Sequence, residues 1–185
     1  METFPIFYKN YIAEPKNEEA KARRFGVVTL LMDFWKRSYN SPPPAFEREE
    51  RGKPCFKGKP LSFSISHCEG LVCCGFLKRE SRGEIGIDIE RVKKGLSDDE
   101  YRRLKNIYRR FFFESETSES KDECKEEFAF SFAELWTKKE ALIKMTGEGI
   151  SAIGKTDALL AEILTYKISL AEKDFILTAA ISKNE

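Results

Sequence analysis

The stretch Glu84-Ile-Gly-Ile-Asp-Ile-Glu90 alternates isoleucine with small or acidic residues along its whole length. This period of two is typical of a β-strand whose isoleucines face a core. Asp88 and Glu90 would then point to the same opposite face, about 6–7 Å apart at Cβ. Two carboxylates this close repel each other, so we expect one to stay protonated unless a cation lies between them. A magnesium ion would suit the pair, and the alternative is an ordinary solvated face of the strand.

The composition is typical of a globular protein with a sizeable core: 41% of the 185 residues are hydrophobic and 34% are charged. The net charge of +1 provides no overall field for nucleic acid or an anionic membrane, so we expect neither as a partner. No apolar run is as long as a membrane span, and the first residues lack the pattern of a secretory signal. The five cysteines, without a C-x-x-C pair, favour reduced thiols in the cytoplasm over a zinc site.

Apolar spacing and turn residues predict a mixed chain of helices and strands. The expected helices are 18–37, 98–113 and 128–146, and the expected strands are 4–11, 61–66, 71–77, 84–90, 161–169 and 175–182. Short turns, one of them at 67–70, join the three strands in the middle of the chain, so we expect these strands to form a meander. The last two strands should form a closing hairpin, although the segment 161–169 is also compatible with a helix.

Capping residues and apolar spacing define the expected ends and faces of the helices. Asn17 and Ser97 are N-cap candidates for the first two helices. Ser131 and Glu134 form a capping box at the start of the third helix or inside it, and Gly147 should end that helix. The first helix carries an apolar stripe that we expect in the core: Phe25, Val28, Leu31, Met32 and Trp35.

A second candidate site lies in the third helix, in the stretch Trp136-Thr-Lys-Lys-Glu-Ala-Leu-Ile-Lys144. Glu140 and Lys144 are four residues apart, which places them on one face of a helix. On its own, such a pair is usually a surface ion pair worth a few tenths of a kcal/mol. Phosphoryl-type transfer uses a metal, cations over the developing charge and an aligned nucleophile, and three carboxylates with nearby lysines would suit this chemistry.

Four motifs resemble those of the phosphopantetheinyl transferases. Gly86-Ile-Asp88-Ile-Glu90 together with Trp136-Thr-x-Lys-Glu140-Ala-x-x-Lys144 is similar to the paired signature of this family. Upstream, Gly52-Lys53-Pro54 and Phe63-Ser-Ile-Ser66-His67 are similar to two further motifs of its Sfp-type branch, in the same order. The resemblance covers residues 50–147, and the motifs are specific in combination although each alone is weak.

The resemblance implies a Mg²⁺-dependent enzyme that transfers the 4′-phosphopantetheine arm of coenzyme A. The acceptor would be a serine of an apo acyl or peptidyl carrier protein, and adenosine 3′,5′-bisphosphate would be released. By the same resemblance, Asp88, Glu90 and Glu140 would hold Mg²⁺ against the pyrophosphate. Glu140 is also the candidate base for the serine proton, and Lys144 is the second candidate catalytic residue.

Five side chains are implied as contacts of coenzyme A itself. Lys144 and Lys139 would contact its phosphates. Ser66 and His67 would meet its 3′-phosphate end, with Lys53 near the same anion. Considered without the family, a lone histidine at a strand end is more often a packed or surface side chain than a ligand.

The sequence departs from the family pattern at several positions. Cys68 follows His67 where the family usually has serine, so one polar contact is missing. A second Gly-Lys-Pro makes Lys59 a competitor of Lys53, although Lys53 has the better spacing to His67. The basic N-terminal positions of Sfp-type members do not align cleanly here, so three residues are left out of the expected site: Lys21, Arg23 and Arg24.

The length of the chain is short for the Sfp-type branch and long for the small trimeric branch of the family. This length favours two pseudo-symmetric α+β lobes, each a helix packed on a small antiparallel sheet. We expect lobes at residues 1–90 and 91–185, joined in one compact monomer with the site at their junction.

The helix 98–113 interleaves arginines and lysines with aromatic residues. We expect it and the acidic, serine-rich loop 114–127 to meet the carrier protein, because carrier helices are typically acidic. Two alternatives to the enzyme are a catalytically silent coenzyme A-binding regulatory protein and an RNA-binding protein that uses this helix. The complete set of three carboxylates argues against the first, and the neutral total charge argues against the second.

Overall fold

The computed structural model describes residues 6–10, 16–78, 83–112, 124–149 and 161–183. The elements follow one another as β1 (Ile6–Asn10), α1 (Lys16–Ser38), β2 (Phe46–Arg48), β3 (Pro54–Phe56), β4 (Leu61–Cys68), β5 (Leu71–Lys78), β6 (Ile85–Arg91), α2 (Asp98–Phe111), α3 (Lys125–Thr146), β7 (Ala161–Leu170) and β8 (Lys173–Ser182). The fold is α+β, as the sequence predicts.

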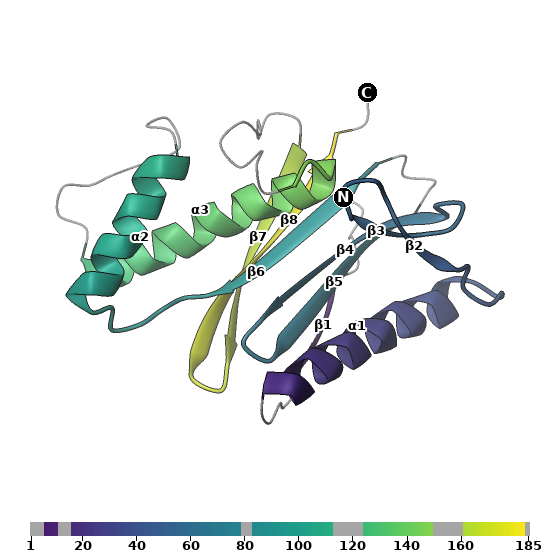
Figure 1. Ribbon diagram of the computed structural model, residues 1–185, viewed down its shortest axis with the longest axis horizontal. Helices are drawn as coiled ribbons and strands as arrows, with labels where there is room; N and C mark the ends of the chain where they lie inside the picture. The colour runs from purple at the N-terminus through teal and green to yellow at the C-terminus, as the bar shows by residue number, and fades with distance from the viewer. Residues whose placement is uncertain (1–5, 11–15, 79–82, 113–123, 150–160, 184–185) are drawn as a thin grey trace.

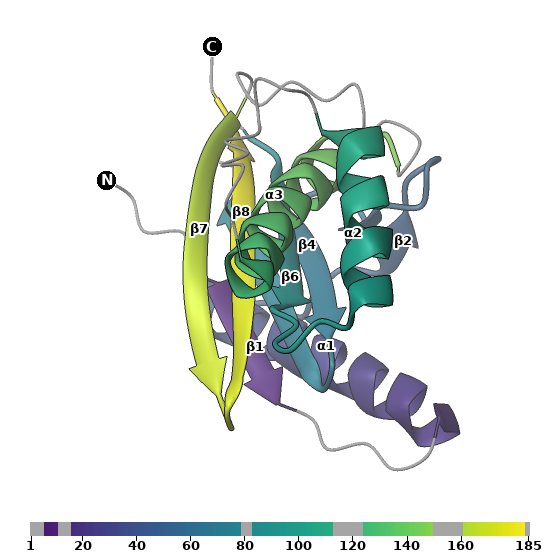
Figure 2. The ribbon, with the colours of Figure 1, turned by 90° about the vertical axis from the view of Figure 1, so that its left-hand side faces the viewer.

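Two small antiparallel sheets occupy the middle of the molecule, and a helix lies on the outer side of each (Figure 1). The first sheet has the order β1-β5-β4 and packs against α1, whereas the second has the order β6-β8-β7 and packs against α3. The view in Figure 2 shows α2 beside α3. The predicted closing hairpin is confirmed by the antiparallel pair β7–β8, so the helical alternative for this segment is wrong.

β6 belongs to the second sheet, which corrects the expected meander of three strands. β4 and β5 form the predicted antiparallel pair, but β6 pairs along its whole length with β8. The reason is that β5 already has β1 on its other edge and therefore offers no free edge to β6. A division into two lobes stays a proposal, and these pairings favour a boundary before β6 over the expected one after Glu90.

β4 and β6 run alongside each other in the same direction although they belong to different sheets. Serine hydroxyls of β4 accept hydrogen bonds from main-chain N–H groups of β6: Ile85 N to Ser62 Oγ at 3.2 Å, Ile87 N to Ser64 Oγ at 3.0 Å and Ile89 N to Ser66 Oγ at 3.3 Å. These three contacts are called the β4–β6 interface below. They explain the alternating serines of β4, because every second side chain of a strand points to the same face.

The isoleucines of β6 lie in the core between the two sheets, as their alternation predicts. Ile85, Ile87 and Ile89 are at most 1% exposed. They pack against inner-face residues of β5 and β8, which include Cys73 and Leu177. The opposite face of β6 is therefore directed at α3.

The buried face of α1 differs from the predicted stripe. Trp35 is buried as expected, but Phe25 is 69% exposed and Val28 is 56% exposed. Leu30 and Phe34 lie in the core instead. α1 has more apolar residues than one face can hold, so helical spacing alone fits two different stripes, and contact with the sheet selects one of them.

α3 begins at Lys125, earlier than the predicted start at residue 128. The N–H of Cys124 donates to the Glu127 carboxylate at 3.1 Å, which is one half of a capping box. Ser131 consequently lies inside the helix and not at its cap. Gly147 ends α3 as predicted, in the left-handed conformation with φ of 71°.

α2 begins after Ser97, as predicted. The Ser97 hydroxyl accepts from the N–H of Glu100, and the Glu100 carboxylate accepts from the N–H of Ser97, so the capping box is complete. Most of the expected loop 114–127 lies outside the described residues, and its last three residues are helical.

Two local predictions in the first half of the chain are wrong. Asn17 lies inside α1, which begins at Lys16. The turn expected at residues 67–70 is shorter, because β4 continues through His67 and the reversal uses Glu69 and Gly70, with φ of 39° and 89°. Neither α1 nor any other helix in the described part of the chain has the length and apolar character needed to cross a bilayer.

Candidate active site

A glycine lets α3 approach β6 closely enough to build the site. A Cβ atom at Gly86 would lie 1.9 Å from the carbonyl oxygen of Ala141 and 2.3 Å from the main-chain nitrogen of Met145. The main chain of α3 therefore rests directly on β6 at this position. Residues of α3 in the neighbouring turns are brought next to Asp88, which follows Gly86 on the same face of the strand.

Asp88 is the buried centre of the site, with 4% of its surface exposed. Its Oδ1 accepts hydrogen bonds from Lys144 Nζ at 2.5 Å and from Ser66 Oγ at 2.7 Å, and Lys144 Nζ also lies 3.1 Å from Ser66 Oγ. Its Oδ2 is buried without a hydrogen-bond partner among the described residues. The predicted residues Ser66, Asp88 and Lys144 are thus brought together from β4, β6 and α3.

Glu90 and Glu140 stand near this centre, and both carry shifted pKa values. Burial first, and then the negative charge of Asp88, raise the pKa of Glu90 to about 7, against the attraction of Lys144. Burial and then Asp88 likewise raise the pKa of Glu140 above its ordinary value. Cys68 Sγ lies 3.8 Å from Glu90 Oε2, so the cysteine that replaces the family's serine still contacts this carboxylate. The expected repulsion between neighbouring carboxylates is therefore present.

The carboxylates fit a hard cation by their chemistry. Asp88 Oδ2 is an unpartnered buried oxygen, and the pKa of Glu90 is raised by burial and then by the charge of Asp88, both of which a bound cation would offset. Within the residues that the structure describes, no three acidic, histidine or cysteine side chains are already gathered as a metal centre. Lys144 provides the positive charge at Asp88 in this arrangement.

Three basic side chains, Arg23, His67 and Lys144, act on one another near Asp88 and are called the cationic group below. Arg23 of α1 and Lys144 of α3 both lower the pKa of His67, after burial as the largest cause, while Asp88 acts in the opposite direction. A ring in this position favours its neutral form, and an anion placed among these groups would restore its charge. Arg23 is the residue that sequence reasoning left out. Its position in a basic run on the early turns of a helix did not single it out, since the packing of α1 on β5 and β1 is what brings it near His67.

One cavity of about 320 Å³ joins two of the predicted motifs. It is lined by the main chain and side chains of Gly52, Lys53 and Pro54 on one side and by Glu140 and Lys144 on the other. The two Gly-Lys-Pro segments differ here, because residues 52–54 line this cavity and residues 58–60 are not among its lining residues. Lys59 of the second segment has a side chain that is 62% exposed and pairs with Glu49, whereas that of Lys53 is 11% exposed.

Two predicted lysines are held away from open solvent. Lys53 Nζ donates to Glu84 Oε2 at 2.5 Å and to the carbonyl oxygen of Met145 at 2.9 Å. Lys139 is 3% exposed, and its Nζ lies 5.5 Å from the centre of the Phe112 ring at the end of α2. Phosphate contacts of these two lysines stay predictions.

A second cavity, of about 180 Å³, opens between α2 and α3 with Glu90 among its lining residues. Leu104 and Ile107 of α2 and Phe132 and Trp136 of α3 provide most of its apolar wall. The carboxylates thus lie between two cavities, one lined by Glu140 and the other by Glu90.

Comparison with known proteins connects this geometry with one family. The sequence profile of the 4′-phosphopantetheinyl transferase superfamily matches residues 84–176. The match covers about half of the chain and includes β6, α2 and α3, and therefore Asp88, Glu90 and Glu140.

Curated relatives support the same assignment beyond that segment. 4′-Phosphopantetheinyl transferase Sfp of Bacillus subtilis is 34% identical over 157 residues, which are 78% of this chain and 64% of the relative. AcpT of Salmonella typhimurium is 33% identical over 126 residues, 68% of this chain and 61% of the relative. HetI of a Nostoc species is 32% identical over 133 residues, 68% of this chain and 51% of the relative. The chain spans less than two thirds of the length of these relatives, and it belongs to the 4′-phosphopantetheinyl transferase superfamily.

Proposed function

We propose that this protein transfers the 4′-phosphopantetheine arm of coenzyme A to a serine hydroxyl of an apo acyl or peptidyl carrier protein. The observation that carries the proposal is the buried contact of Asp88 with Lys144 and Ser66, flanked by Glu90 and Glu140. A buried anion, a lysine and further carboxylates at the meeting point of two sheets match what transfer from a pyrophosphate needs. The relatives are named as 4′-phosphopantetheinyl transferases, which supports the same reaction.

Magnesium is the proposed cofactor, held by Asp88, Glu90 and Glu140. Oxygen ligands with excess negative charge suit a hard divalent ion, and the unpartnered Oδ2 of Asp88 is available for one. When bound, the ion would neutralise charge on the pyrophosphate of coenzyme A. Lys144, which now pairs with Asp88, would then be available to the phosphates from one turn beyond Glu140.

The cationic group is the proposed site for the anionic end of coenzyme A. The positive charges of Arg23 and Lys144 both act on His67, and an added phosphate would reduce the repulsion among all three. Ser66, which is 5% exposed, is engaged with Asp88, so it would act on this end mainly by holding its neighbours. The neighbouring cavity beside Gly52 and Pro54 would take the nucleotide, and the apolar cavity beside Glu90 would take the pantetheine chain.

The reaction itself is a displacement at the β-phosphorus of coenzyme A. The acceptor serine oxygen forms a bond to phosphorus, and the bond to the bridging oxygen breaks, so that adenosine 3′,5′-bisphosphate leaves with the electron pair. We assign the serine proton to Glu140, directly or through a water, because this carboxylate lines the nucleotide-side cavity beside Lys144. Lys144 would stabilise the charge that develops on the transferred phosphate.

The proposed contact surface for the carrier protein is the exposed basic face of α2. Its outward-facing cations are Arg102, Arg103, Arg109 and Arg110. They suit the acidic helices of a carrier by charge, and α2 also forms one wall of the cavity at Glu90. Replacing Arg102 and Arg109 by glutamate should reduce transfer to the carrier while leaving coenzyme A affinity nearly unchanged. An equal loss of both would disprove this surface.

Three further assignments complete the proposal. A monomer is proposed, because residues of both sheets in one chain complete the site. A role in the cytoplasm is proposed because all five cysteines are free. Nucleic acid and membranes are not proposed as partners, in keeping with the net charge of +1.

The test is intact-protein mass spectrometry of apo carrier proteins incubated with this protein, coenzyme A and Mg²⁺. Wild type should add the mass of one phosphopantetheine, and a chelator, Asp88→Ala or Glu140→Ala should abolish the gain. Glu134→Ala is the matched control on the same helix, since Glu134 forms a surface pair with Lys138. Absence of any gain across several classes of carrier, with coenzyme A still bound, would contradict the proposed function.

A further inference from the structure

The ammonium group of Lys53 joins three segments that are far apart in the sequence. Lys53 itself lies in the connection between β2 and β3. Its ammonium group donates to Glu84, just before β6, and to Met145 O, in the last turn of α3. The Lys53 side chain is 11% exposed, whereas that of Glu84 is 50% exposed, so the lysine is enclosed although its carboxylate partner reaches solvent.

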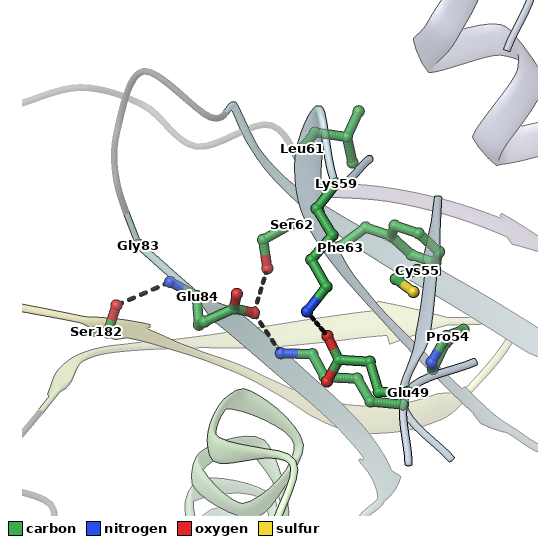
Figure 3. A pocket seen from close by; sticks show the side chains of 11 residues that line it. Glu49, Pro54, Cys55, Lys59, Leu61, Ser62, Phe63, Gly83, Glu84 and Ser182 are labelled. Carbon is green, nitrogen blue, oxygen red and sulfur yellow. Dashed lines mark hydrogen bonds and ion pairs between the residues drawn. The ribbon is translucent and has the colours of Figure 1, made fainter. Parts of the chain in front are cut away.

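Glu84 is itself held in place, so the contact has a rigid anchor. Its Oε2 also accepts from Ser62 Oγ at 2.8 Å, and its main-chain N–H donates to Ser182 Oγ at 2.8 Å (Figure 3). Ser62 is the first member of the β4–β6 interface, and Ser182 is the last residue of β8. Lys53 therefore binds to a point where both sheets end.

The other acceptor lies in the last turn of α3. The last carbonyl groups of a helix have no partner within the helix, and they carry partial negative charge that favours a nearby cation. Met145 O is one of these groups, and Lys53 Nζ satisfies it at 2.9 Å. The Lys53 stem also packs close to Gly147, whose position would place a Cβ 3.6 Å from Lys53 Cδ.

We propose that Lys53 is a positioning residue: its ammonium group fixes the last turn of α3 to the start of β6 and so keeps Lys144 at Asp88. This inference rests on the proposed function for its catalytic meaning. Lys144 directly precedes Met145, so a displacement of that turn moves the ammonium group that contacts Asp88. The family resemblance implies a different role, a direct charge contact with the nucleotide phosphate. For that role Lys53 would need to leave Glu84 or use its one remaining N–H.

The experiment compares Lys53→Met, Lys53→Arg, Glu84→Gln and the double variant Lys53→Met/Glu84→Gln. Lys59→Met is the matched control, since Lys59 belongs to the other Gly-Lys-Pro and is exposed. The first readout is amide hydrogen exchange in the unliganded protein, which should become faster at Met145–Gly147 in Lys53→Met and Glu84→Gln. The double variant should exchange no faster than the single ones, because both remove the same contact. Unchanged exchange in these variants would overturn the proposal.

The second readout separates positioning from phosphate binding. In Lys53→Met, kcat for transfer should fall about tenfold or more, whereas the dissociation constant of adenosine 3′,5′-bisphosphate should change by less than about twofold. Lys53→Arg should recover much of kcat. A phosphate ligand would behave in the opposite way, with a weaker bisphosphate complex in Lys53→Met and no slowing in Glu84→Gln, which would overturn the proposal. If wild type modified no carrier, the proposed function would fail, and the exchange data would still decide what Lys53 does.

Discussion

β6 contacts the two halves of the molecule by different means. Towards β8 it forms a continuous main-chain ladder, and towards α3 its Gly86 lets main chain rest on main chain. Towards β4 it is joined through side chains, chiefly the serine hydroxyls, and towards β5 it meets Gly75 with the side chain of Ile87. β6 is thus joined to the C-terminal elements α3 and β8 through the main chain, with Gly86 required at the approach of α3, and to the N-terminal elements β4 and β5 through particular side chains.

This difference has a consequence for where the site lies. Asp88 is on the strand where both kinds of contact meet, with Lys144 delivered by α3 and Ser66 by β4. The α3 side holds Lys144 through a rigid main-chain approach. The β4 side depends on hydroxyl groups whose loss would leave buried N–H groups without partners.

The largest expected effect is that of Gly86→Ala. The new Cβ would meet the main chain of α3, which cannot move aside unless the helix is displaced. We expect the free energy of unfolding to fall by more than about 3 kcal/mol, with loss of transfer. Gly75→Ala is the control: its Cβ would lie 2.7 Å from Ile87 Cγ2, a buried side-chain atom and not main chain, so a loss of about 1–3 kcal/mol is expected. Equal losses in urea denaturation would disprove the contrast between the two sides.

A smaller effect is expected from Ser64→Ala. Ser64 is 5% exposed, and its removal leaves Ile87 N buried without an acceptor. The free energy of unfolding should fall by about 1–3 kcal/mol. Ser62→Ala, at the half-buried end of the same interface, should cost about 1 kcal/mol or less because the hydrogen bond that it removes is only partly buried. If the two variants unfolded at the same urea concentration, burial of the β4–β6 interface would not be the source of its stability.

The smallest effect concerns the charge of His67, the only histidine of the chain. Its pKa should lie below the ordinary value, rise in Arg23→Ala, and rise when adenosine 3′,5′-bisphosphate binds, since each change lowers the surrounding positive charge. A lowered pKa in the folded state means that the unfolded chain takes up the proton first, so stability should decrease as the pH falls below the ordinary value. One imidazole signal in an NMR titration reports all of this. A pKa that does not respond to Arg23→Ala would separate α1 from the site.

Short-range patterns accounted for the strands and most helix ends. The isoleucines of β6, the capping box at Ser97 and the glycine after α3 each act within a few residues, so the sequence alone predicts them correctly. The partner of β6 is a different kind of question. It depends on β1 occupying the free edge of β5, which no local pattern of residues 84–90 contains.

The site shows the same division. Spacing predicted that Asp88 and Glu90 share a face and that α3 carries Lys144, and the structure places these residues together. The alternating serines of β4 predict a strand, but not that they form the contact with β6, because a buried polar face and a solvated one have the same pattern. Arg23 and the engaged ammonium group of Lys53 follow from packing over long sequence distances.

Cys73 and Cys74 are adjacent in β5, but their side chains lie in different cores, Cys73 between the sheets and Cys74 under α1. Both are fully buried, and burial raises the pKa of each thiol, that of Cys73 to about 12. A thiol reagent can reach either one only after the layer above it opens. The rate at which a thiol reagent modifies Cys73 would therefore report separation of the sheets, and the rate for Cys74 would report departure of α1 from its sheet.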